Sequence, residues 1–323
     1  MKIRIATRKS ELAMLQAKYV ANKLSKLNNI DTELVPLLSD GDQTEKPLHE
    51  IGGKGLFVNK LESALLADDA DIAVHSLKDV PATLDKKFKI AAVFERESPS
   101  DILLSKDGVT LTNMASESII GTSSPRRKSQ ILNLRPDLRT IPVRGNIATR
   151  IEKLNRGDFD GLIVAKAALN RLNIKLDHSY ECSLDEMLPA ASQGFIAAEC
   201  LSSNTQIVNI LNQINNKDEF RLAIAERKFV AALNGSCLSP IAVYCVNKNN
   251  KVSVKAKVLS QNGSEKIYKE IESDITNLNT DITYLAKDFI KNKVSGKKND
   301  HIRLANKLSD VFIKLGAKRM LKC

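Results

Sequence analysis

Residues 3–10 read Ile3-Arg4-Ile5-Ala6-Thr7-Arg8-Lys9-Ser10, and residues 119–124 read Ile119-Ile120-Gly121-Thr122-Ser123-Ser124. Each stretch is a short apolar run that ends in hydroxyl or basic residues, and each is followed by apolar residues at helical spacing. Ser10 can act as an N-cap, and Pro125 suits the first turn of a helix. The repeated order of strand, polar residues and helix predicts two similar α/β lobes, each with a largely parallel sheet.

The neighbouring sequence extends both lobes. Residues 32–38 are a second expected strand, so the chain opens with a βαβ unit, and residues 71–75 form a short buried strand. In the second half, strands are expected at 139–143 and 161–165, with a helix between them. If the two lobes face one another, their helix N-termini and hydroxyl caps point towards a common ligand, which favours an anion.

The pattern changes after about residue 212. A helix over 220–233 leads into a loop that contains Cys237, and two strands near 241–246 and 252–259 are expected to run antiparallel. Helical patterns follow at 281–292 and 304–315. This part of the chain therefore predicts a smaller α+β domain.

The cysteines argue against a disulfide framework and against structural zinc. The chain has 323 residues and five scattered cysteines, without CxxC or Cys/His ligand spacing: Cys182, Cys200, Cys237, Cys245 and Cys323. The first residues lack an apolar signal core, and no uncharged apolar run is long enough to span a bilayer. We therefore expect a cytoplasmic protein without a membrane partner.

A formal charge of +11 raises the possibility of nucleic-acid binding, but the excess lies in the C-terminal third. Residues 246–323 hold 17 Lys and Arg against 8 Asp and Glu, whereas residues 1–245 hold 32 against 30. The basic third has few aromatic residues among its lysines, so it is better interpreted as a solvated face. No nucleic-acid partner is expected.

Several charged residues stand where α/β folds place their ligands. Asp79 follows the buried strand at 71–75, with Lys78 beside it, although a turn or surface ion pair is the alternative interpretation. Arg126 and Arg127 at a helix start are unfavourable unless they meet an anion, and a solvated pair is the alternative. Arg144 and Arg150 repeat this arrangement at the next strand-to-helix junction. Arginines at such junctions indicate a ligand rich in carboxylates or phosphates.

Several catalytic motifs are absent from the sequence. Residues 52–55 (Gly52-Gly53-Lys54-Gly55) lack the spacing of a nucleotide P-loop, and there is no GxGxxG after a strand and no GxSxG. The four histidines are scattered, and we expect His75 to be a hydrogen-bonded core residue and not a metal ligand. Cys237 lies in a loop of small residues where a bulky group can reach a thiol, although a lone cysteine is most often a small buried side chain.

Seven motifs, in this order along residues 1–245, resemble those of the porphobilinogen deaminase (hydroxymethylbilane synthase) family. They are Ile5-Ala6-Thr7-Arg8-x-Ser10-x-Leu12-Ala13, Gly52-Gly53-Lys54-Gly55-Leu56-Phe57, Val74-His75-Ser76-Leu77-Lys78-Asp79-Val80-Pro81, Gly121-Thr122-Ser123-Ser124-x-Arg126-Arg127, Arg144-Gly145-Asn146, Gln193-Gly194 and Gly235-Ser236-Cys237-x-x-Pro240-Ile241. The remaining C-terminal third resembles the family only in general character.

The resemblance implies a three-domain α/β protein whose first two lobes are similar to type II periplasmic binding proteins. Domain 1 is then expected at 1–94 with a return segment at 195–212, domain 2 at 98–190, and a C-terminal α+β domain at 215–323. The last of these carries the cysteine loop.

Members of the family are transferases of haem biosynthesis. They join four porphobilinogen molecules head to tail with release of ammonia and form hydroxymethylbilane. The chain is primed on a dipyrromethane cofactor that is held by a thioether, here implied at Cys237. Asp79 is the implied catalytic residue, and a mobile loop is implied at Lys54 and Phe57. The implied substrate- and cofactor-binding residues are Arg8, Ser10, Lys78, Thr122, Ser124, Arg126, Arg127, Arg144 and Arg150, with Arg171 and Gln193 as weaker matches.

The chain departs from the family pattern at a few positions, and it leaves one other class of function open. Ala168 and Ser192 replace expected glycines, and Phe195 stands where a small residue is usual, which bears on rate and not on identity. The alternative is a non-catalytic, two-lobed protein that binds an anionic ligand. We expect a monomer without a metal ion.

Overall fold

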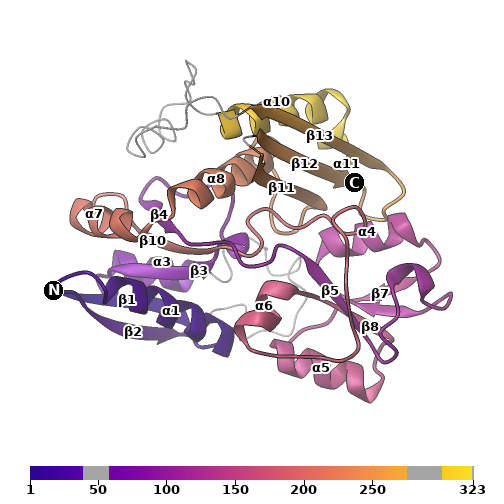
Figure 1. Ribbon diagram of the computed structural model, residues 1–323, viewed down its shortest axis with the longest axis horizontal. Helices are drawn as coiled ribbons and strands as arrows, with labels where there is room; N and C mark the ends of the chain where they lie inside the picture. Colours follow the sequence, from indigo (N-terminus) through magenta and orange to yellow (C-terminus); the bar gives the residue numbers. More distant parts are fainter. Residues whose placement is uncertain (39–57, 250, 275–299, 322–323) are drawn as a thin grey trace.

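The first lobe is built on a five-stranded sheet with the strand order β2-β1-β3-β10-β4 (Figure 1). Its strands are β1 (Lys2–Arg8), β2 (Asp31–Leu37), β3 (Ile72–Ser76), β4 (Phe88–Val93) and β10 (Ile196–Leu201). β1 pairs in parallel with β2 and β3, whereas β10 runs antiparallel to β3 and β4. The structure, a computed structural model, describes residues 1–38, 58–249, 251–274 and 300–321.

Helices cover both faces of this first sheet. On one face, α1 (Glu11–Leu24) and α7 (Thr205–Ile214) pack their apolar residues against Ile3 and Ile5 of β1. On the other face, α3 (Asn59–Leu66) packs against Ala6 of β1 and Ala73 of β3. The alternating residues of β1 thus face two separate cores, as expected for a strand inside an α/β layer structure. The predicted opening βαβ unit is confirmed.

The second lobe repeats this plan with the strand order β7-β6-β8-β5-β9. Its elements are β5 (Asp101–Ser105), β6 (Ile119–Gly121), α4 (Pro125–Leu134), β7 (Arg139–Ile141), α5 (Ile147–Arg156), β8 (Gly161–Ala165), α6 (Lys166–Arg171) and β9 (Ser179–Glu181). β6 is parallel to β7 and β8, and β5 is antiparallel to β8 and β9. The two sheets therefore have the same order of parallel and antiparallel pairs, and the expected pair of similar α/β lobes is confirmed.

The C-terminal domain has an antiparallel sheet of three strands, which are β11 (Ile241–Lys248), β12 (Lys251–Leu259) and β13 (Lys266–Asp274). Helices α8 (Lys217–Ala232) and α10 (Asp300–Lys314) share one core with this sheet, where Phe229 and Phe312 meet edge to face at 5.2 Å between ring centroids. A short helix, α11 (Ala317–Met320), ends the described chain. The sequence predicted the first two strands and the last long helix but missed β13, and the helix expected at 281–292 lies outside the described residues.

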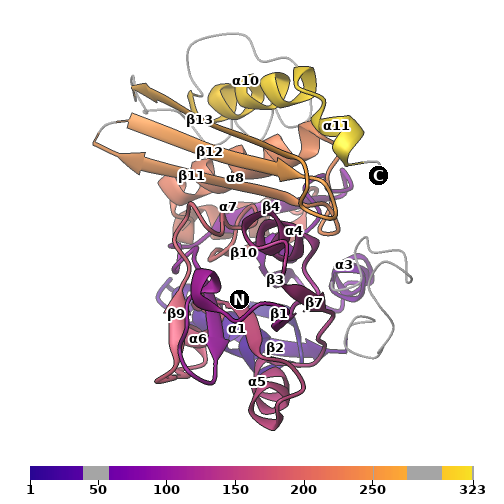
Figure 2. The same cartoon turned by 90° about the vertical axis from the view of Figure 1, so that its right-hand side faces the viewer.

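Two crossing segments join the lobes, and the C-terminal domain lies across both of them (Figures 1 and 2). The first segment, residues 94–100, leads from β4 to β5, and the second, residues 189–195, returns to β10. Gly194 in the second has a φ of +95°, and a Cβ there would lie 2.1 Å from the carbonyl oxygen of Glu97 in the first. The segments therefore touch backbone to backbone. The sheets fit the division into 1–94 with 195–212, 98–190 and 215–323, which stays a prediction.

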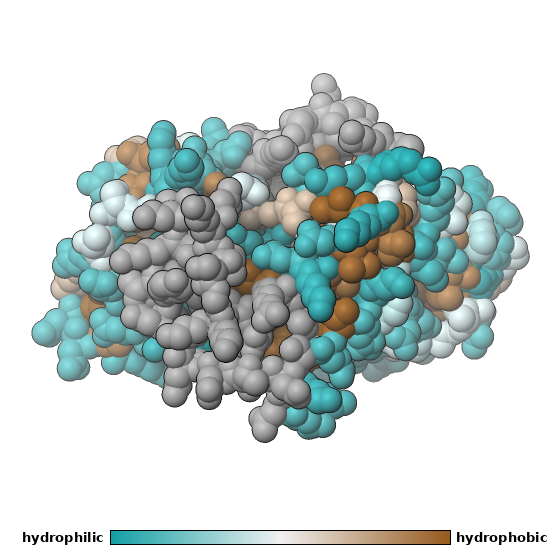
Figure 3. Space-filling view, turned by 90° about the horizontal axis from the view of Figure 1, so that it is seen from above, coloured by the Kyte–Doolittle hydropathy of each residue, from teal (hydrophilic) through white to brown (hydrophobic). Residues whose placement is uncertain are grey.

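The face that carries the C-terminal domain is mainly hydrophilic, with its most prominent apolar group beside the grey atoms and smaller apolar groups elsewhere (Figure 3). Among the described residues, no helix has both the length and the apolar character needed to cross a membrane.

Candidate active site

A pocket of about 60 Å³ opens in the first lobe where β1 and β3 end. It is lined by Arg8, Ser10, Leu12, Ala13, Gln16, Val58, Val74, His75, Ser76 and Asp79. Ser10 occupies the N-cap position of α1, but its side chain makes no capping hydrogen bond. The hydroxyl of Ser10 is therefore not used by the helix that it begins, and it stands in a pocket wall beside Arg8.

Asp79 is held at the edge of this pocket by a short 3-10 turn, η1 (Leu77–Asp79). The backbone N–H of Leu77 donates to Phe195 on the neighbouring segment, at 3.0 Å, and the N–H of Val80 closes the turn on Leu77. Lys78 extends towards the second crossing segment, where its Nζ donates to Oε1 of Gln193 at 3.4 Å. Burial and, to a smaller extent, the nearby charge of Arg127 together lower the pKa of Lys78 to about 8.

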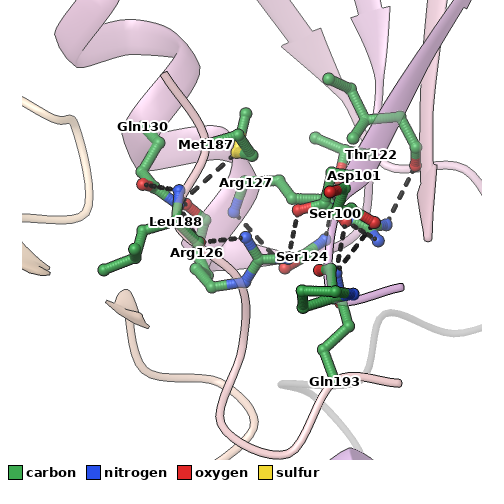
Figure 4. A network of polar contacts seen from close by, with 12 residues as sticks. Ser100, Asp101, Thr122, Ser124, Arg126, Arg127, Gln130, Met187, Leu188 and Gln193 are labelled. Atoms are coloured by element: carbon green, nitrogen blue, oxygen red, sulfur yellow. Dashed lines mark hydrogen bonds and ion pairs between the residues drawn. The ribbon is translucent and has the colours of Figure 1, made fainter. Parts of the chain in front are cut away.

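In the second lobe, hydroxyl groups and arginines gather at the start of α4 (Figure 4). Ser124 is the N-cap, and its Oγ accepts from the N–H of Arg127 at 3.4 Å, while Thr122 Oγ1 accepts from the N–H of Ser124. The two arginines that follow are buried and turn inwards onto a carboxylate at the start of β5, Asp101, which is fully buried.

Asp101 is the anion that Arg126 and Arg127 meet. Arg127 Nη2 lies 2.7 Å from Oδ1 of Asp101, and Arg126 Nη2 lies 2.8 Å from Oδ2. Arg127 also donates through Nη1 to the carbonyl of Ile163, and Arg126 donates to that of Leu188. These two arginines hold the pKa of Asp101 far below its usual range, although burial acts in the opposite direction. The sequence analysis did not identify Asp101 as a site residue. The local signal for it is a charged residue directly before the apolar run 102–104.

Arg144 and Arg150 stand at the next junction, before and within α5. One terminal nitrogen of Arg144, Nη2, is buried and has no hydrogen-bond partner. Arg150 donates through Nε to the carbonyl of Gly145 at 2.7 Å. Burial lowers the pKa of Arg150, the charges of Arg127, Arg144 and Arg8 act in the same direction and Asp79 opposes them, so that the pKa is about 10. Arg150 of the second lobe is thus close enough to sense charges at the pocket of the first lobe.

Gln193 and Arg171 contact the crossing segments. Gln193 donates through Nε2 to the carbonyl of Pro99 at 2.6 Å and to Oδ1 of Asp101 at 3.0 Å, so it ties one segment to the other. Arg171, at the end of α6, donates to the carbonyl of Gly194 at 2.6 Å. Both residues therefore contact the joint between the lobes, and Gln193 also reaches the carboxylate that the arginines of α4 bind.

The Cys237 loop approaches the same place from the C-terminal domain. Cys237 is exposed, whereas Cys182, Cys200 and Cys245 are buried. The protein around the sulfur raises the pKa of Cys237 through partial burial, the negative charge of Asp79 raises it further, and Arg227 acts in the opposite direction. The thiol is therefore protonated near neutral pH, and it is near enough to Asp79 to sense its charge.

Two further expectations concern His75 and the glycine loop. His75 is buried, and its Nε2 lies 2.9 Å from Oε2 of Glu199, so the expected hydrogen-bonded core histidine is confirmed. No cluster of His, Cys, Asp and Glu that could hold a metal ion occurs in the part of the chain that the structure describes. Lys54 and Phe57 lie outside the described residues.

Comparisons with known proteins agree along nearly the whole chain. The family model "Porphobilinogen deaminase, dipyromethane cofactor binding domain" matches residues 3–209, and "Porphobilinogen deaminase, C-terminal domain" matches residues 220–291. A porphobilinogen deaminase of Campylobacter hominis is 39% identical over 99% of this chain and 97% of its own length. One from Caldicellulosiruptor saccharolyticus is 38% identical over 96% of this chain and 99% of its own.

Solved structures with a similar course of the chain have low sequence identity. The periplasmic VFT2 domain of BvgS from Bordetella pertussis has a TM-score of 0.42 and 12% identity, and the match covers 69% of this chain and 92% of that domain. The substrate-binding protein of an amino acid ABC transporter has a TM-score of 0.36 and 14% identity, with 66% and 91% covered. The family models and the close relatives, which extend over both lobes and the C-terminal domain, decide the matter: the chain belongs to the porphobilinogen deaminase family.

Proposed function

We propose that the chain is a transferase that joins four porphobilinogen molecules head to tail, releases four molecules of ammonia and, with water, yields hydroxymethylbilane. The observation that carries the proposal is the meeting of a carboxylate, an exposed thiol and several arginines from different parts of the fold. Asp79 comes from the first lobe, Arg144 and Arg150 from the second, and Cys237 from the C-terminal domain. The electrostatic effect of Asp79 on both Arg150 and Cys237 supports the proposal that these residues surround a common space.

The residues present fit a dipyrromethane cofactor joined to Cys237 by a thioether. Cys237 is the exposed thiol among the described cysteines, and the buried, unpartnered Nη2 of Arg144 is a donor that a carboxylate of such a group would satisfy. When bound, the cofactor supplies the free pyrrole carbon on which the product chain is built. The raised pKa of the Cys237 thiol suits a permanent anchor better than a nucleophile used in every turnover.

We assign Asp79 to the reacting ring. Loss of ammonia from porphobilinogen leaves a cationic azafulvene, and the carboxylate of Asp79 would stabilise that charge as it develops. A preorganised group of this kind contributes about 3–4 kcal/mol when water is excluded. Asp79 borders the pocket beside Ser76 and Arg8, which is where a pyrrole ring with its acetate and propionate would lie. The same carboxyl group can pass a proton to the departing amine.

The remaining charged residues would bind the carboxylates of the growing chain. Arg8 and Ser10 line the pocket, and Arg150 of the second lobe is near enough to sense the charges of Arg8, Asp79 and Arg144. Next to the Asp101 network lie Lys78, Thr122 and Ser124. Arg126 and Arg127 are already paired with Asp101, so they would contribute a positive potential and hold this network in place. We place Arg171 and Gln193 at the joint that carries these groups. Lys54 and Phe57 remain assigned to a loop over the site on the family resemblance alone.

The mass of the protein as isolated tests this function. Protein purified from cells should carry an adduct equal to two deaminated pyrrole units, localised to Cys237 by peptide mapping. The Cys237→Ser variant should fold and lack the adduct, because serine cannot form the thioether. An unmodified wild-type protein that binds porphobilinogen without releasing ammonia would instead support a non-catalytic binding protein.

We also propose that the enzyme acts as a cytoplasmic monomer without a nucleic-acid or membrane partner. The basic excess of the C-terminal third motivates the control experiment for this proposal. Light scattering during gel filtration should give the mass of one chain of 35.6 kDa, and the protein should not be retained on DNA at about 0.15 M salt. A dimer mass would contradict the first statement, and salt-sensitive retention the second.

A further inference from the structure

The loop that carries Asp79 is fastened to the C-terminal domain by one arginine. Arg227 lies on α8, and its Nη1 donates to the carbonyl oxygen of Val80 at 3.0 Å, while its Nη2 donates to that of Pro81. Both acceptors follow Asp79 directly in the chain. The planar fork of a guanidinium can hold two adjacent carbonyls in one fixed geometry, which a lysine ammonium on its flexible stem cannot do.

The same helix leads directly into the Cys237 loop, and the connection is stiff. The N–H of Gly235 returns to the carbonyl of Val230 in the last turn of α8 at 2.9 Å. A Cβ on Gly235 would lie 2.4 Å from Ile241, so this backbone is pressed against β11. Beyond it, Ser236 and Ser239 bond to one another across the cysteine. The position of α8 therefore fixes the position of Cys237.

Arg227 is a buried cation near the carboxylate of Glu199. Its side chain is about 3% exposed, and its Nε has no hydrogen-bond partner. Burial lowers the pKa of Arg227 and the negative charge of Glu199 on β10 opposes this, with the result that the pKa is about 10. Glu199 is fully buried and also contacts His75, which immediately precedes the strand end leading to Asp79. Keeping an arginine here carries a desolvation cost that a purely apolar contact between the domains would avoid.

We propose that Arg227 is a positioning residue that fixes the Asp79 loop relative to the Cys237 loop. The Asp79 carboxylate would then lie next to the end of the chain anchored at Cys237. The proposal rests on the proposed function, because it assigns the reacting charge to Asp79 and the anchor to Cys237. Arg227 itself touches backbone oxygens and not the reacting atoms. Its loss should therefore lower kcat and leave the affinity for porphobilinogen, which the pocket of the first lobe would supply, nearly unchanged.

A matched pair of charge-conserving variants, Arg227→Lys and Arg96→Lys, tests the proposal. Arg96, in the first crossing segment, joins α8 to the second crossing segment, through Glu226 at 2.7 Å and the carbonyl of Gln193 at 2.9 Å, and its guanidinium lies over the ring of Phe195. It does not contact the Asp79 loop through any described hydrogen bond. Both variants should melt at a lower temperature than wild type. In Arg227→Lys we expect the adduct to be present, KM within about twofold of wild type and kcat at least tenfold lower, whereas Arg96→Lys should keep kcat within about twofold.

Three results would overturn the proposal: equal losses of kcat in both variants, wild-type kcat in Arg227→Lys, or an adduct missing from Arg227→Lys alone. If Arg227→Lys does not fold, hydrogen exchange on the wild-type holoenzyme tests the proposal instead. The amide of Val80 should then exchange as slowly as the central amides of α8, and exchange as fast as in the following loop, residues 82–87, would refute the fastening. Failure of the proposed function is seen separately, as a wild-type protein without adduct or ammonia release.

Discussion

At the scale of single residues, the arginines of the site differ in whether an ion pair already binds them. Arg126 and Arg127 pair with Asp101 and with backbone carbonyls, although Nε of Arg126 is buried without a hydrogen-bond partner. Among the described residues, Arg144 has no ion pair, and its Nη2 is buried without a partner. An unpartnered buried donor carries a cost that a ligand carboxylate would remove. Arg144 is therefore the arginine whose surroundings are most clearly completed by a ligand.

Replacing Asp79 by asparagine should abolish most of the turnover while preserving the fold. Asparagine has the same shape but no charge, so it cannot offset the cation that forms when ammonia leaves. We expect kcat to fall by about 10²–10³-fold, the range found when one preorganised electrostatic contact is removed. The measurement is the initial rate of ammonia release by protein whose adduct has been verified by mass.

Asp85→Asn is the control for this prediction. Asp85 is an exposed carboxylate six positions further along, where its Oδ1 accepts from the N–H of Lys87. Its replacement should leave the rate within about twofold of wild type. An Asp79→Asn protein with a near-normal rate would remove Asp79 from the proposed chemistry.

Sequence reasoning located these residues but not their partners. The pattern placed Arg126 and Arg127 at a helix start that calls for an anion, because the position within a helix can be read locally. It could not show that the anion is Asp101, because that contact depends on how β5 packs beneath α4, elements that are separated along the chain. The same holds for Glu199, which pairs with His75 across 124 positions of sequence.

At the scale of elements, the sequence was most informative where apolar runs end in glycine, proline or hydroxyl residues. The strands at 119–121 and 161–165 and the helix from Pro125 were predicted in this way. The strands β4, β5, β9, β10 and β13 were not predicted, and for three of them the sequence gives a reason. The apolar run of β5 is too short to be assigned by periodicity, β9 spans only Ser179–Glu181, and β13 is rich in charged residues.

The contact between β5 and α4 should depend on the charge of Asp101. In Asp101→Asn, two buried arginines lose their counterion, and breaking a buried ion pair from one side costs about 3–5 kcal/mol. Because the pKa of Asp101 is depressed in the folded protein, its stabilisation is complete above the unfolded value of about 3.9 and declines as the pH falls below it. The difference in unfolding free energy between wild type and variant should therefore be smaller at pH 3 than at pH 7.

Urea denaturation at the two pH values provides the measurement. Asp107→Asn, a change at an exposed turn residue after β5, should stay within about 0.5 kcal/mol of wild type at both. A difference between wild type and Asp101→Asn that grew on acidification would contradict the stated role of the carboxylate.

At the scale of the whole molecule, the C-terminal domain is positioned by contacts with both lobes. Glu226 of α8 pairs with Arg96 of the first crossing segment. The turn between β12 and β13 packs against α4, where Asn133 donates to the carbonyl of Gly263 at 2.8 Å. Lys257 of β12 donates to the carbonyl of Asp185 at 3.0 Å. None of these long-range contacts has a local pattern in the sequence, so the arrangement of the three parts could be expected only from the family resemblance.

Gly263→Ala should loosen the contact between the C-terminal domain and the second lobe. Gly263 has a φ of +75°, and an added Cβ would lie 2.5 Å from the carbonyl oxygen of Ser129 and 2.7 Å from the nitrogen of Asn133. Both neighbours are backbone atoms of α4, so the domains must move apart. We expect about 1–3 kcal/mol of overpacking cost in addition to about 1–2 kcal/mol of backbone strain.

Gly316→Ala separates these two contributions. Its φ is +88°, yet a Cβ there would meet nothing within 4 Å, so it carries only the backbone strain. Calorimetry of the holoenzyme should therefore show a larger fall in melting temperature for Gly263→Ala than for Gly316→Ala. Equal falls would mean that the turn does not fasten the domain to α4.

One cysteine is exposed and three are buried among the described residues, so thiol labelling can measure the fraction of molecules that lack the cofactor at Cys237. Cys182, Cys200 and Cys245 are shielded, and burial raises the pKa of each thiol, so a maleimide dye should react with them slowly. Cys237 should take the dye only in molecules whose sulfur is not already alkylated. In a Cys323→Ser background, which removes the cysteine outside the described residues, the fluorescence of a brief labelling reaction would count the molecules with a vacant anchor.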